Sequence, residues 1–400
     1  MKKTIKLAVV AALALGTTSV FATNGSALIG MGAKARGMAG LGIGMSHGAE
    51  SALVNPALIT SVKGTEVSFG GTVFMPHVKN TNTTVSNTGV PSTGSANSDA
   101  SLNLIPEVSL ATKVNDHFYW GVGMWGTGGM GVDYRGNGAQ LGMLTNLQIM
   151  QFGVPLAYKI DGLSIAVTPI VQYGSLDINY VTSNGTTGNG VSQDYKWGYN
   201  VGLAYQTDGL TIGATYTSQI DMNYKGQLST AMKGMGVNYA NNKLSTPATY
   251  GVGVSYKFGG STIGFDYKQI KWSNAYGYKD FDWKDQNVYT VGYQYNADTW
   301  AARLGYNYAK SPISEQAQSS VNSAGLLGGL VNTFNLLGFP AIVQSHVAIG
   351  GTYKFSKQTS VDLAYTYAFS TTNTYKNYWG QNISTTHSQD GVSAQLNYKF

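Results

Sequence analysis

The side chains best suited to chemistry are four charges isolated among apolar and small residues: Glu107, Asp266, Lys268 and Arg303. A lysine or arginine in such surroundings can neutralise the carboxylate of a ligand through a charge-assisted hydrogen bond. It can equally pair with a neighbouring acidic side chain and brace the fold. Both interpretations stay open for each residue of this set.

The five histidines suggest no other chemistry. His47, His77, His117, His346 and His387 are scattered along the chain without the spacing of a metal-ligand set. The chain has no cysteine, so thiolate catalysis is excluded, and no Ser-His-Asp arrangement can be placed. We therefore predict no metal site, no cofactor and no enzymatic activity.

The isolated charges lie in segments where apolar side chains occupy every second position, as in residues 261–269 and 300–308. A period of two indicates a strand with two different faces. If the apolar face meets lipid, the charges point inward, because a charge at the bilayer midplane costs about 2–4 kcal/mol. The same parity turns three apolar side chains inward, where they could line a pocket for an alkyl or aryl group: Phe74, Trp125 and Ile170.

Roughly 14 alternating segments follow one another, each of about ten residues, the length that a tilted strand needs to cross a membrane. Tight turns, such as Asp161-Gly162, alternate with longer polar connections, such as 226–246 and 370–387. This alternation is typical of bacterial outer-membrane barrels, whose closure leaves no unpaired edge in lipid. We predict an all-β fold, a transmembrane antiparallel β-barrel of about 14 strands over residues 63–400. Four tyrosines at predicted strand ends are expected at the membrane interface: Tyr134, Tyr180, Tyr224 and Tyr308.

The composition and both ends of the chain favour an exported membrane barrel over the alternative, an exported soluble β-sandwich. Residues 1–22 combine lysines, a short apolar run and a small-x-small ending, which predicts a cleaved signal peptide. Charged residues make up only 11% of the chain, against about 25% in soluble domains. The sequence has no cluster of lysines and arginines of the kind that binds phosphates, so we predict no nucleic-acid partner. The last strand ends in Tyr398 and Phe400, an aromatic ending expected to be recognised by the barrel-assembly machinery. We expect a monomer in contact with outer-membrane lipid.

Residues 23–62 do not alternate and are rich in glycine and alanine, which suits a hatch, or plug, inside the barrel lumen. Its Ala-x-x-Asn-Pro-Ala sequence, Ala52 to Ala57, contains the motif Asn55, Pro56 and Ala57. This motif, with IPEVSLATKV, FYWGVGMWGTGGMGVDY, VPLAYKI and RLGYNYAKSPIS in order along the chain, resembles the FadL/TodX family of outer-membrane transporters. The resemblance implies a plugged 14-stranded barrel that passes long-chain fatty acids or aromatic hydrocarbons inward without an energy source. It also implies binding in the lumen and lateral release through the wall.

The third strand segment contains four glycines: Gly126, Gly128, Gly129 and Gly131. Glycine inside a strand marks a bulge or bend and leaves no side chain to seal a gap. The resemblance implies a lateral opening beside a kinked third strand, a position that these glycines match. The alternative is that they only accommodate the curvature of the barrel.

The sixth long loop, about 311–342, is the most apolar. The third, about 180–194, is short and polar, unlike the large third and fourth loops of fatty-acid members of the family. An exposed apolar patch of this kind needs a reason. The segment either captures hydrophobic ligand or packs over the barrel mouth. Its candidate capture residues are Leu326, Leu327, Leu330, Phe334, Leu337 and Phe339.

The predicted function is passive uptake of long-chain fatty acids or other hydrophobic small molecules. The alternatives are an aromatic-hydrocarbon channel of the same family and a general porin or an adhesin. A porin would carry ladders of lumenal charge and no hatch. An outer-membrane hydrolase or adhesin would need a catalytic constellation or much larger loops.

Overall fold

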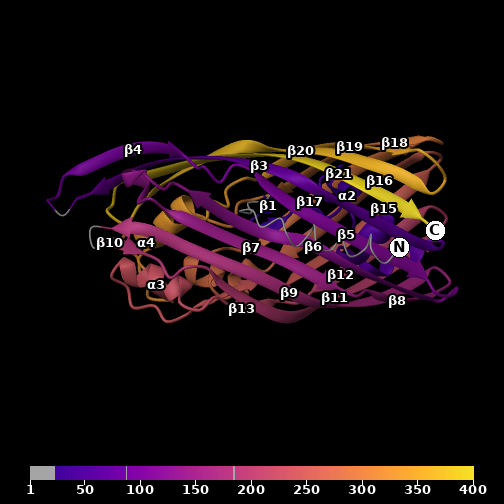
Figure 1. Ribbon diagram of the computed structural model, residues 1–400, viewed down its shortest axis with the longest axis horizontal. Helices are drawn as coiled ribbons and strands as arrows, with labels where there is room; N and C mark the ends of the chain where they lie inside the picture. Colours follow the sequence, from indigo (N-terminus) through magenta and orange to yellow (C-terminus); the bar gives the residue numbers. More distant parts are fainter. Residues whose placement is uncertain (1–22, 87, 183–184) are drawn as a thin grey trace, which may run out of the picture.

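The computed structural model describes residues 23–400 apart from residues 87 and 183–184. The predicted signal peptide, residues 1–22, lies outside the described residues. Long tilted strands run side by side along the molecule, and the C-terminus lies at one end of them (Figure 1).

A closed sheet of 14 antiparallel strands forms the wall, which confirms the predicted fold class. The strands in chain order are β3 (Thr65–Val85), β5 (Asn103–Lys113), β6 (Phe118–Asp133), β7 (Leu144–Gly153) continued by β8 (Leu156–Ile160), β9 (Leu163–Thr182), β11 (Ser192–Thr207), β12 (Leu210–Thr217), β15 (Thr249–Phe258), β16 (Ser261–Ile270), β17 (Gln286–Asn296), β18 (Trp300–Ala309), β19 (Ser345–Lys354), β20 (Thr359–Lys376) and β21 (Asn382–Lys399). The last strand, β21, pairs with β3 from Lys399 opposite Glu66 to Ile383 opposite Asn82, and this pairing closes the barrel.

The two faces of the wall differ as the alternation predicts. Outward side chains are exposed, for example Leu304 at 56% and Phe265 at 44%. Their neighbours Arg303 and Asp266 point inward and are buried. An apolar outer band over a polar interior is the distribution that an outer-membrane barrel requires.

The longer connections gather at one end of the barrel, opposite the C-terminus (Figure 1). They contain β4 (Pro91–Asn97), η3 (Gly138–Gln140), β10 (Gly185–Thr187), β13 (Ile220–Asn223), α3 (Gln227–Gly234), β14 (Lys243–Thr246), η4 (Trp272–Asn274), η5 (Tyr278–Phe281), α4 (Gly328–Thr333) and the π-helical turn η6 (Phe334–Gly338). Tight turns join the strands at the other end, which faces the periplasm in barrels of this kind. In the part of the chain that the structure describes, no helix is long and apolar enough to cross a bilayer.

Two expectations about this end were wrong. The stretch 370–387 is mostly strand, because β20 and β21 continue their pairing well past the membrane and turn only at 377–381. Tyr134, Tyr180 and Tyr224 are fully buried rather than at the lipid interface, since the folded loops cover the inward side of the strand ends. Tyr308 alone of the four is exposed, at 39%.

The N-terminal segment, residues 23–62, packs against inward-facing side chains of the wall. It contains β1 (Thr23–Asn24), β2 (Ala27–Leu28), α2 (Ala33–Arg36), η1 (Gly48–Leu53) and η2 (Pro56–Ser61). Its regular elements are very short, so contacts with the wall rather than its own hydrogen bonds must hold it in place.

Candidate functional site

The wall is interrupted along β6. The pairing of β6 with β5 ends at Trp125, opposite Glu107, and does not continue beyond it. On its other side, β6 pairs with β7, but with a bulge in which Gly126 and Gly128 face consecutive residues and Thr127 is left over. At the far end of β6, the N–H of Asp99 donates to the carbonyl of Asp133 at 2.9 Å, and this hydrogen bond joins β6 again to the segment that precedes β5. We call the unpaired stretch between Trp125 and Asp133 the β6 window.

The N-terminal segment fills part of the β6 window. Ala27 of β2 pairs with Gly128, and the N–H of Gly129 donates to the carbonyl of Ser26 at 3.0 Å. A Cβ on Gly128 would lie 2.8 Å from that same carbonyl oxygen, so only glycine allows this approach. Of the four glycines predicted to form an opening, Gly128 and Gly129 thus make direct contact with the N-terminal segment.

A lumenal cavity of about 130 Å³ lies directly behind the β6 window. Ser26, Ala27, Thr127 and Gly128 line its side towards the wall. The cavity therefore faces the β6 window, and Ser26, Ala27 and Leu28 lie between the two.

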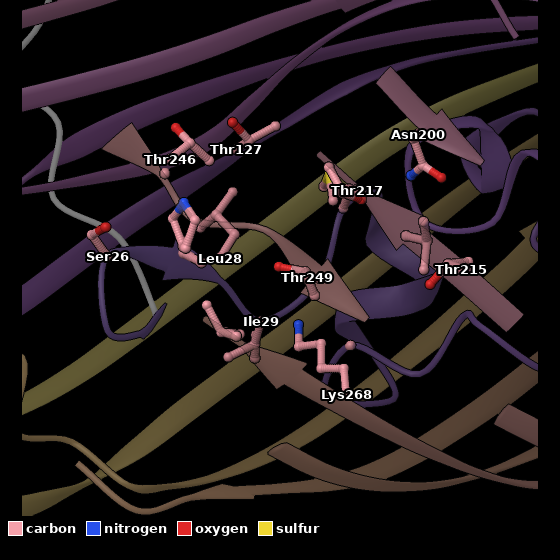
Figure 2. A pocket seen from close by; sticks show the side chains of 18 of the residues that line it. Ser26, Leu28, Ile29, Thr127, Asn200, Thr215, Thr217, Thr246, Thr249 and Lys268 are labelled. Carbon is pink, nitrogen blue, oxygen red and sulfur yellow. The ribbon is translucent and has the colours of Figure 1, made fainter. Parts of the chain in front are cut away.

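Lys268 carries the one lysine or arginine side chain among the residues lining this cavity. Figure 2 shows its amine directed into the space near Ile29 and Thr249. Among the described residues, Lys268 has no hydrogen bond or ion pair within contact distance. An ammonium so placed is available to a ligand carboxylate.

The rest of the cavity wall combines hydroxyl and amide groups with apolar side chains (Figure 2). The polar members are Thr127, Gln151, Asn200, Thr215, Thr217, Thr246, Thr249 and Thr290, and the larger apolar ones are Leu28, Ile29, Met31, Ile43, Ile149, Ile270 and Trp272. None of these residues was predicted from the sequence to line a cavity. The inward parity of threonines in β12 and β15 was a usable signal, whereas the contributions of residues 26–31 could not be read from periodicity.

Glu107 braces the N-terminal segment. Its carboxylate accepts two hydrogen bonds from the guanidinium of Arg36, at 2.6 and 2.7 Å, and one from the N–H of Gly32 at 3.1 Å. Arg36 and Glu107 are both nearly fully buried. Three of the hydrogen bonds that this carboxylate can accept come from the N-terminal segment, and its charge is paired with Arg36, which favours the structural interpretation.

Asp266 also binds the N-terminal segment. Its two carboxylate oxygens accept hydrogen bonds from the consecutive N–H groups of Gly42, Ile43 and Gly44, at 2.7, 2.7 and 3.0 Å. Asp266 borders the cavity, but its hydrogen-bonding capacity is used by the backbone of residues 42–44.

Arg303 belongs to a buried charge cluster with Asp362, Lys34 and Glu50. Its guanidinium lies 3.5 Å from Asp362 and donates to Gln294 at 2.6 Å. Lys34 lies 2.8 Å from Glu50 and 3.6 Å from Asp362, so the cluster joins the N-terminal segment to β18 and β20. Arg303 does not line the cavity beside Lys268.

Burial perturbs the titration of the N-terminal segment. Burial lowers the pKa of His47 to about 3, and its Nε2 lies 2.7 Å from the carbonyl of Leu41. Burial raises the pKa of Glu50, and the nearby carboxylate of Asp362 raises it further. The ammonium of Lys34 offsets this increase only in part. Burial alone would lower the pKa of Lys34, but the two carboxylates hold it above its usual range. His47 is therefore neutral at pH 7, where Lys34 is charged.

The Asn55-Pro56-Ala57 motif anchors the segment to the wall. The amide nitrogen of Asn55 donates to the carbonyls of Ile43 at 2.8 Å and Leu203, in β11, at 3.0 Å. Its oxygen accepts from the N–H of Ala57 at 3.2 Å and so caps η2, with Pro56 at its first position.

The apolar side chains that were predicted to line a pocket lie elsewhere. Phe74, Trp125 and Ile170 point inward and are buried, as parity predicts, but none of them lines the cavity beside Lys268. Phe74 packs with Leu28 and Ile105 instead.

Of the two alternatives for the sixth loop, the structure favours packing over the barrel mouth, because most of its apolar side chains are buried and form no exposed patch. Leu326, Leu330, Phe334 and Leu337 are buried, because the loop folds inward and packs against buried side chains of the barrel mouth. Phe339 is half-buried against the same cluster, and Leu327 is 38% exposed.

At the opposite end, Tyr398 and Phe400 are exposed, at 43% and 69%, with ring centroids 4.8 Å apart. The N–H of Phe400 donates to the carbonyl of Thr65 at 2.9 Å, which extends the closing pairing to the last residue. Both rings are therefore accessible on the outside of the closing strand.

Comparisons with known proteins identify relatives of this architecture. The family described as Outer membrane protein transport protein (OMPP1/FadL/TodX) matches residues 13–321. The long-chain fatty acid transport protein of Escherichia coli K12 is 21% identical, over 82% of this chain and 85% of its own length. A crystal structure of a Pseudomonas aeruginosa FadL homologue superposes with a TM-score of 0.74 at 16% identity, covering 94% of this chain and 100% of that one. The crystal structure of the P. putida toluene transporter TodX gives a TM-score of 0.67 at 17% identity, covering 93% and 99%.

Proposed function

Because this chain belongs to the outer membrane protein transport family (OMPP1/FadL/TodX), we propose that it carries hydrophobic small molecules passively across the outer membrane. In this proposal residues 23–62 act as the hatch of the barrel, residues 63–400 as the wall, and residues 1–22 as a signal peptide removed on export. The protein acts as a transporter rather than an enzyme, without a cofactor.

The observation that carries the proposal is the position of the lumenal cavity beside the β6 window. A ligand held near Lys268 lies next to the one stretch of wall where β6 lacks a partner strand on one side. Release sideways into the membrane requires β2 to leave Gly128 and Gly129, which breaks two backbone contacts and no wall ladder. Lateral release is therefore less costly at this position than between two fully paired strands.

Two ligand classes fit the family, and the cavity supports each in a different way. The unpaired ammonium of Lys268 favours a carboxylate, as in a fatty acid. The volume of about 130 Å³ is close to that of an engineered apolar cavity, about 150 Å³, that binds benzene. This size favours a monoaromatic compound or one end of a longer chain, and the second candidate function is therefore an aromatic-hydrocarbon channel.

The other partners follow from the same placement. Tyr398 and Phe400 are proposed as the signal for the barrel-assembly machinery, and the exposed apolar band as the lipid contact of a monomer. Among the six candidate capture residues of the sixth loop, Leu327 is the exposed one and is proposed to make the first contact with ligand.

Substitution of Gly128 by valine tests the exit route. We expect Gly128→Val to lower uptake of toluene and palmitate by intact cells at equal surface level, because the side chain occupies the β6 window. Gly351→Val is the matched control, since a Cβ there, in β19, would meet only the Ala301 carbonyl oxygen at 3.3 Å.

Two results separate the possible outcomes. Unchanged uptake by Gly128→Val would place the exit elsewhere. New leakage of small polar solutes would show instead that the side chain displaced Ser26 and the hatch.

A further inference from the structure

Three aromatic side chains from the loop between β16 and β17 form a compact group above the cavity: Trp272, Tyr278 and Trp283. Their ring centroids are 4.6 Å (Trp272 to Tyr278), 4.7 Å (Tyr278 to Trp283) and 5.1 Å (Trp272 to Trp283) apart. All three are buried. We call these three residues the aromatic triad.

The aromatic triad separates two spaces. Trp272 lines the lumenal cavity beside Lys268. Tyr278 and Trp283 line a second, smaller space of about 20 Å³ on the side of the loops. Its remaining lining residues are apolar apart from Asn335: Met130, Leu228, Leu244, Phe281, Asn335 and Phe339. The aromatic triad therefore lies between the two spaces, in contact with both.

Each ring of the aromatic triad is tied by its polar atom to a different element. The indole N–H of Trp272 donates to Gln286 in β17 at 3.2 Å, and that of Trp283 donates to Asn335 in η6 at 2.9 Å. The hydroxyl of Tyr278 bonds to the hydroxyl of Ser26 at 2.9 Å. Burial raises the pKa of Tyr278, so its hydroxyl keeps its proton.

Ser26 connects the aromatic triad to the β6 window. Its side chain holds Tyr278, and its carbonyl accepts the N–H of Gly129. The neighbouring Gly25, with φ of 69°, lies directly against the Trp272 ring, where a Cβ would not fit. Displacing Tyr278 or Trp272 therefore acts on the same residues that occupy the gap in the wall.

We propose that the aromatic triad is a gate that selects flat ligands, and that the Tyr278–Ser26 hydrogen bond holds it shut. The proposal rests on the transport function proposed above. Rings in edge and tilted contact can exchange one partner for a flat ring that makes the same kind of contact, worth about 0.5–1.5 kcal/mol beyond area burial. A puckered ring with the same number of carbon atoms offers no such contact and must separate the rings further.

Removing the hydrogen bond while keeping the rings tests the gate. We expect Tyr278→Phe and Ser26→Ala each to raise the initial rate of naphthalene uptake by intact cells about two- to tenfold, the range expected for the loss of one hydrogen bond. The double variant should be no faster than either single variant, because both remove the same bond. Tyr306→Phe is the matched control: it removes a tyrosine–serine bond of 3.1 Å to Ser345 on the outer face of the barrel and should leave the rate unchanged.

Selectivity gives a second readout, which a merely structural role would not change. Decalin has the carbon skeleton of naphthalene but puckered rings, so the wild type should take up naphthalene about two- to tenfold faster, the range that corresponds to the energy of such a ring contact. Trp283→Ala should reduce that ratio towards one, and Trp283→Phe should restore most of it.

The outcomes separate the gate from the transport function. Wild-type uptake equal to that of cells lacking the protein overturns the transport proposal itself. Wild-type uptake with unchanged rates in Tyr278→Phe and Ser26→Ala, with additive effects in the double variant, or with an unchanged ratio in Trp283→Ala, overturns the gate.

Discussion

The interior of the barrel contains two regions that treat charge in opposite ways. In the first, Glu107, Asp266 and Arg303 are each bonded to partners from the N-terminal segment or from the cluster that holds it, although Asp266 also borders the cavity. At the lumenal cavity, Lys268 faces hydroxyl groups and apolar side chains and has no carboxylate in contact. The first region we call the bracing region and the second the cavity region.

All four charged residues point into the lumen, so their positions in the strands do not distinguish them. Their charge partners do. A paired buried charge contributes to a fixed arrangement, and removing one partner leaves the other uncompensated. An unpaired charge costs desolvation, which a ligand of opposite charge can offset. Charge pairing, rather than inward orientation, therefore distinguishes structural charges from candidate ligand groups in this lumen.

Among the predicted substitutions, one in the bracing region should have the largest effect, on the docking of the N-terminal segment. Glu107→Ala leaves the Arg36 guanidinium buried without a carboxylate, which costs about 3–5 kcal/mol. We expect the N-terminal segment to detach, with conductance for small ions in planar bilayers, while heat-modifiable migration on SDS gels shows an intact barrel. Replacing both partners, Arg36→Met with Glu107→Leu, should restore a closed lumen. A closed Glu107→Ala protein would contradict the bracing role.

The cavity region should respond with ligand affinity instead of leakage. Lys268→Met removes one charge-assisted hydrogen bond, worth about 1.5–3 kcal/mol, or about tenfold to a hundredfold in affinity. Purified protein should lose affinity for benzoate but keep its affinity for toluene, which has a methyl group in place of the carboxylate. Arg303→Met, the matched change in the bracing region, should affect both ligands alike and raise conductance. Equal losses for both ligands in Lys268→Met would remove the distinction between the two regions.

A change of pH should act on the bracing region through His47. Its pKa is lowered by burial from 6.5 to about 3, so the detached segment binds a proton that the docked segment does not. Docking is therefore fully stable above pH 6.5 and loses stability as the pH falls towards 3, by about 2 kcal/mol at pH 5.

The variant His47→Gln keeps a donor for the Leu41 carbonyl but does not titrate. Wild-type conductance should rise between pH 7 and pH 5 by more than that of His47→Gln. Both proteins contain Glu50, whose raised pKa therefore cancels in the comparison. Identical pH profiles would exclude His47 as the titrating group.

The smallest effect is expected at Asn55. Asn55→Ser keeps an oxygen that can cap η2 but loses the bonds to Ile43 and Leu203, at a net cost of about 0.5–1.5 kcal/mol for each bond. Hydrogen exchange of residues 43–57 should be faster, with little change in conductance. Wild-type exchange rates would show that this anchor contributes nothing beyond the cap.

The barrel could be predicted from the sequence because its rule is local. A residue two positions away lies on the same face, so the inward orientation of Asp266, Lys268 and Arg303 follows from their immediate neighbours. What each inward charge contacts does not follow from parity. Glu107 meets Arg36 from 71 positions away, and only the three-dimensional arrangement brings the two together.

The predictions that were wrong have the same cause, because contacts with distant segments do not follow from the local alternation. Tyr180 and Tyr224 alternate as wall residues do, but loops that carry no period-two signal fold over them. Phe334 has the apolar character of a capture surface, yet η6 places it in contact with Tyr180 at a centroid distance of 6.0 Å. The aromatic triad lies in a loop, where neither periodicity nor spacing predicts that three rings meet.

The contacts of the N-terminal segment also set an order of assembly. The N–H of Thr23 bonds to Gln389 and that of Ala33 to Gln395, partners 366 and 362 positions away in the closing strand. Such contacts cannot form until the last strand is in place, and closing loops of this length is slow. Arg36 and Glu107, by contrast, are only 71 positions apart and both precede most of the wall. We expect this pair to form early and to hold the segment inside the curling sheet, so that the barrel closes around a plug that is already tethered.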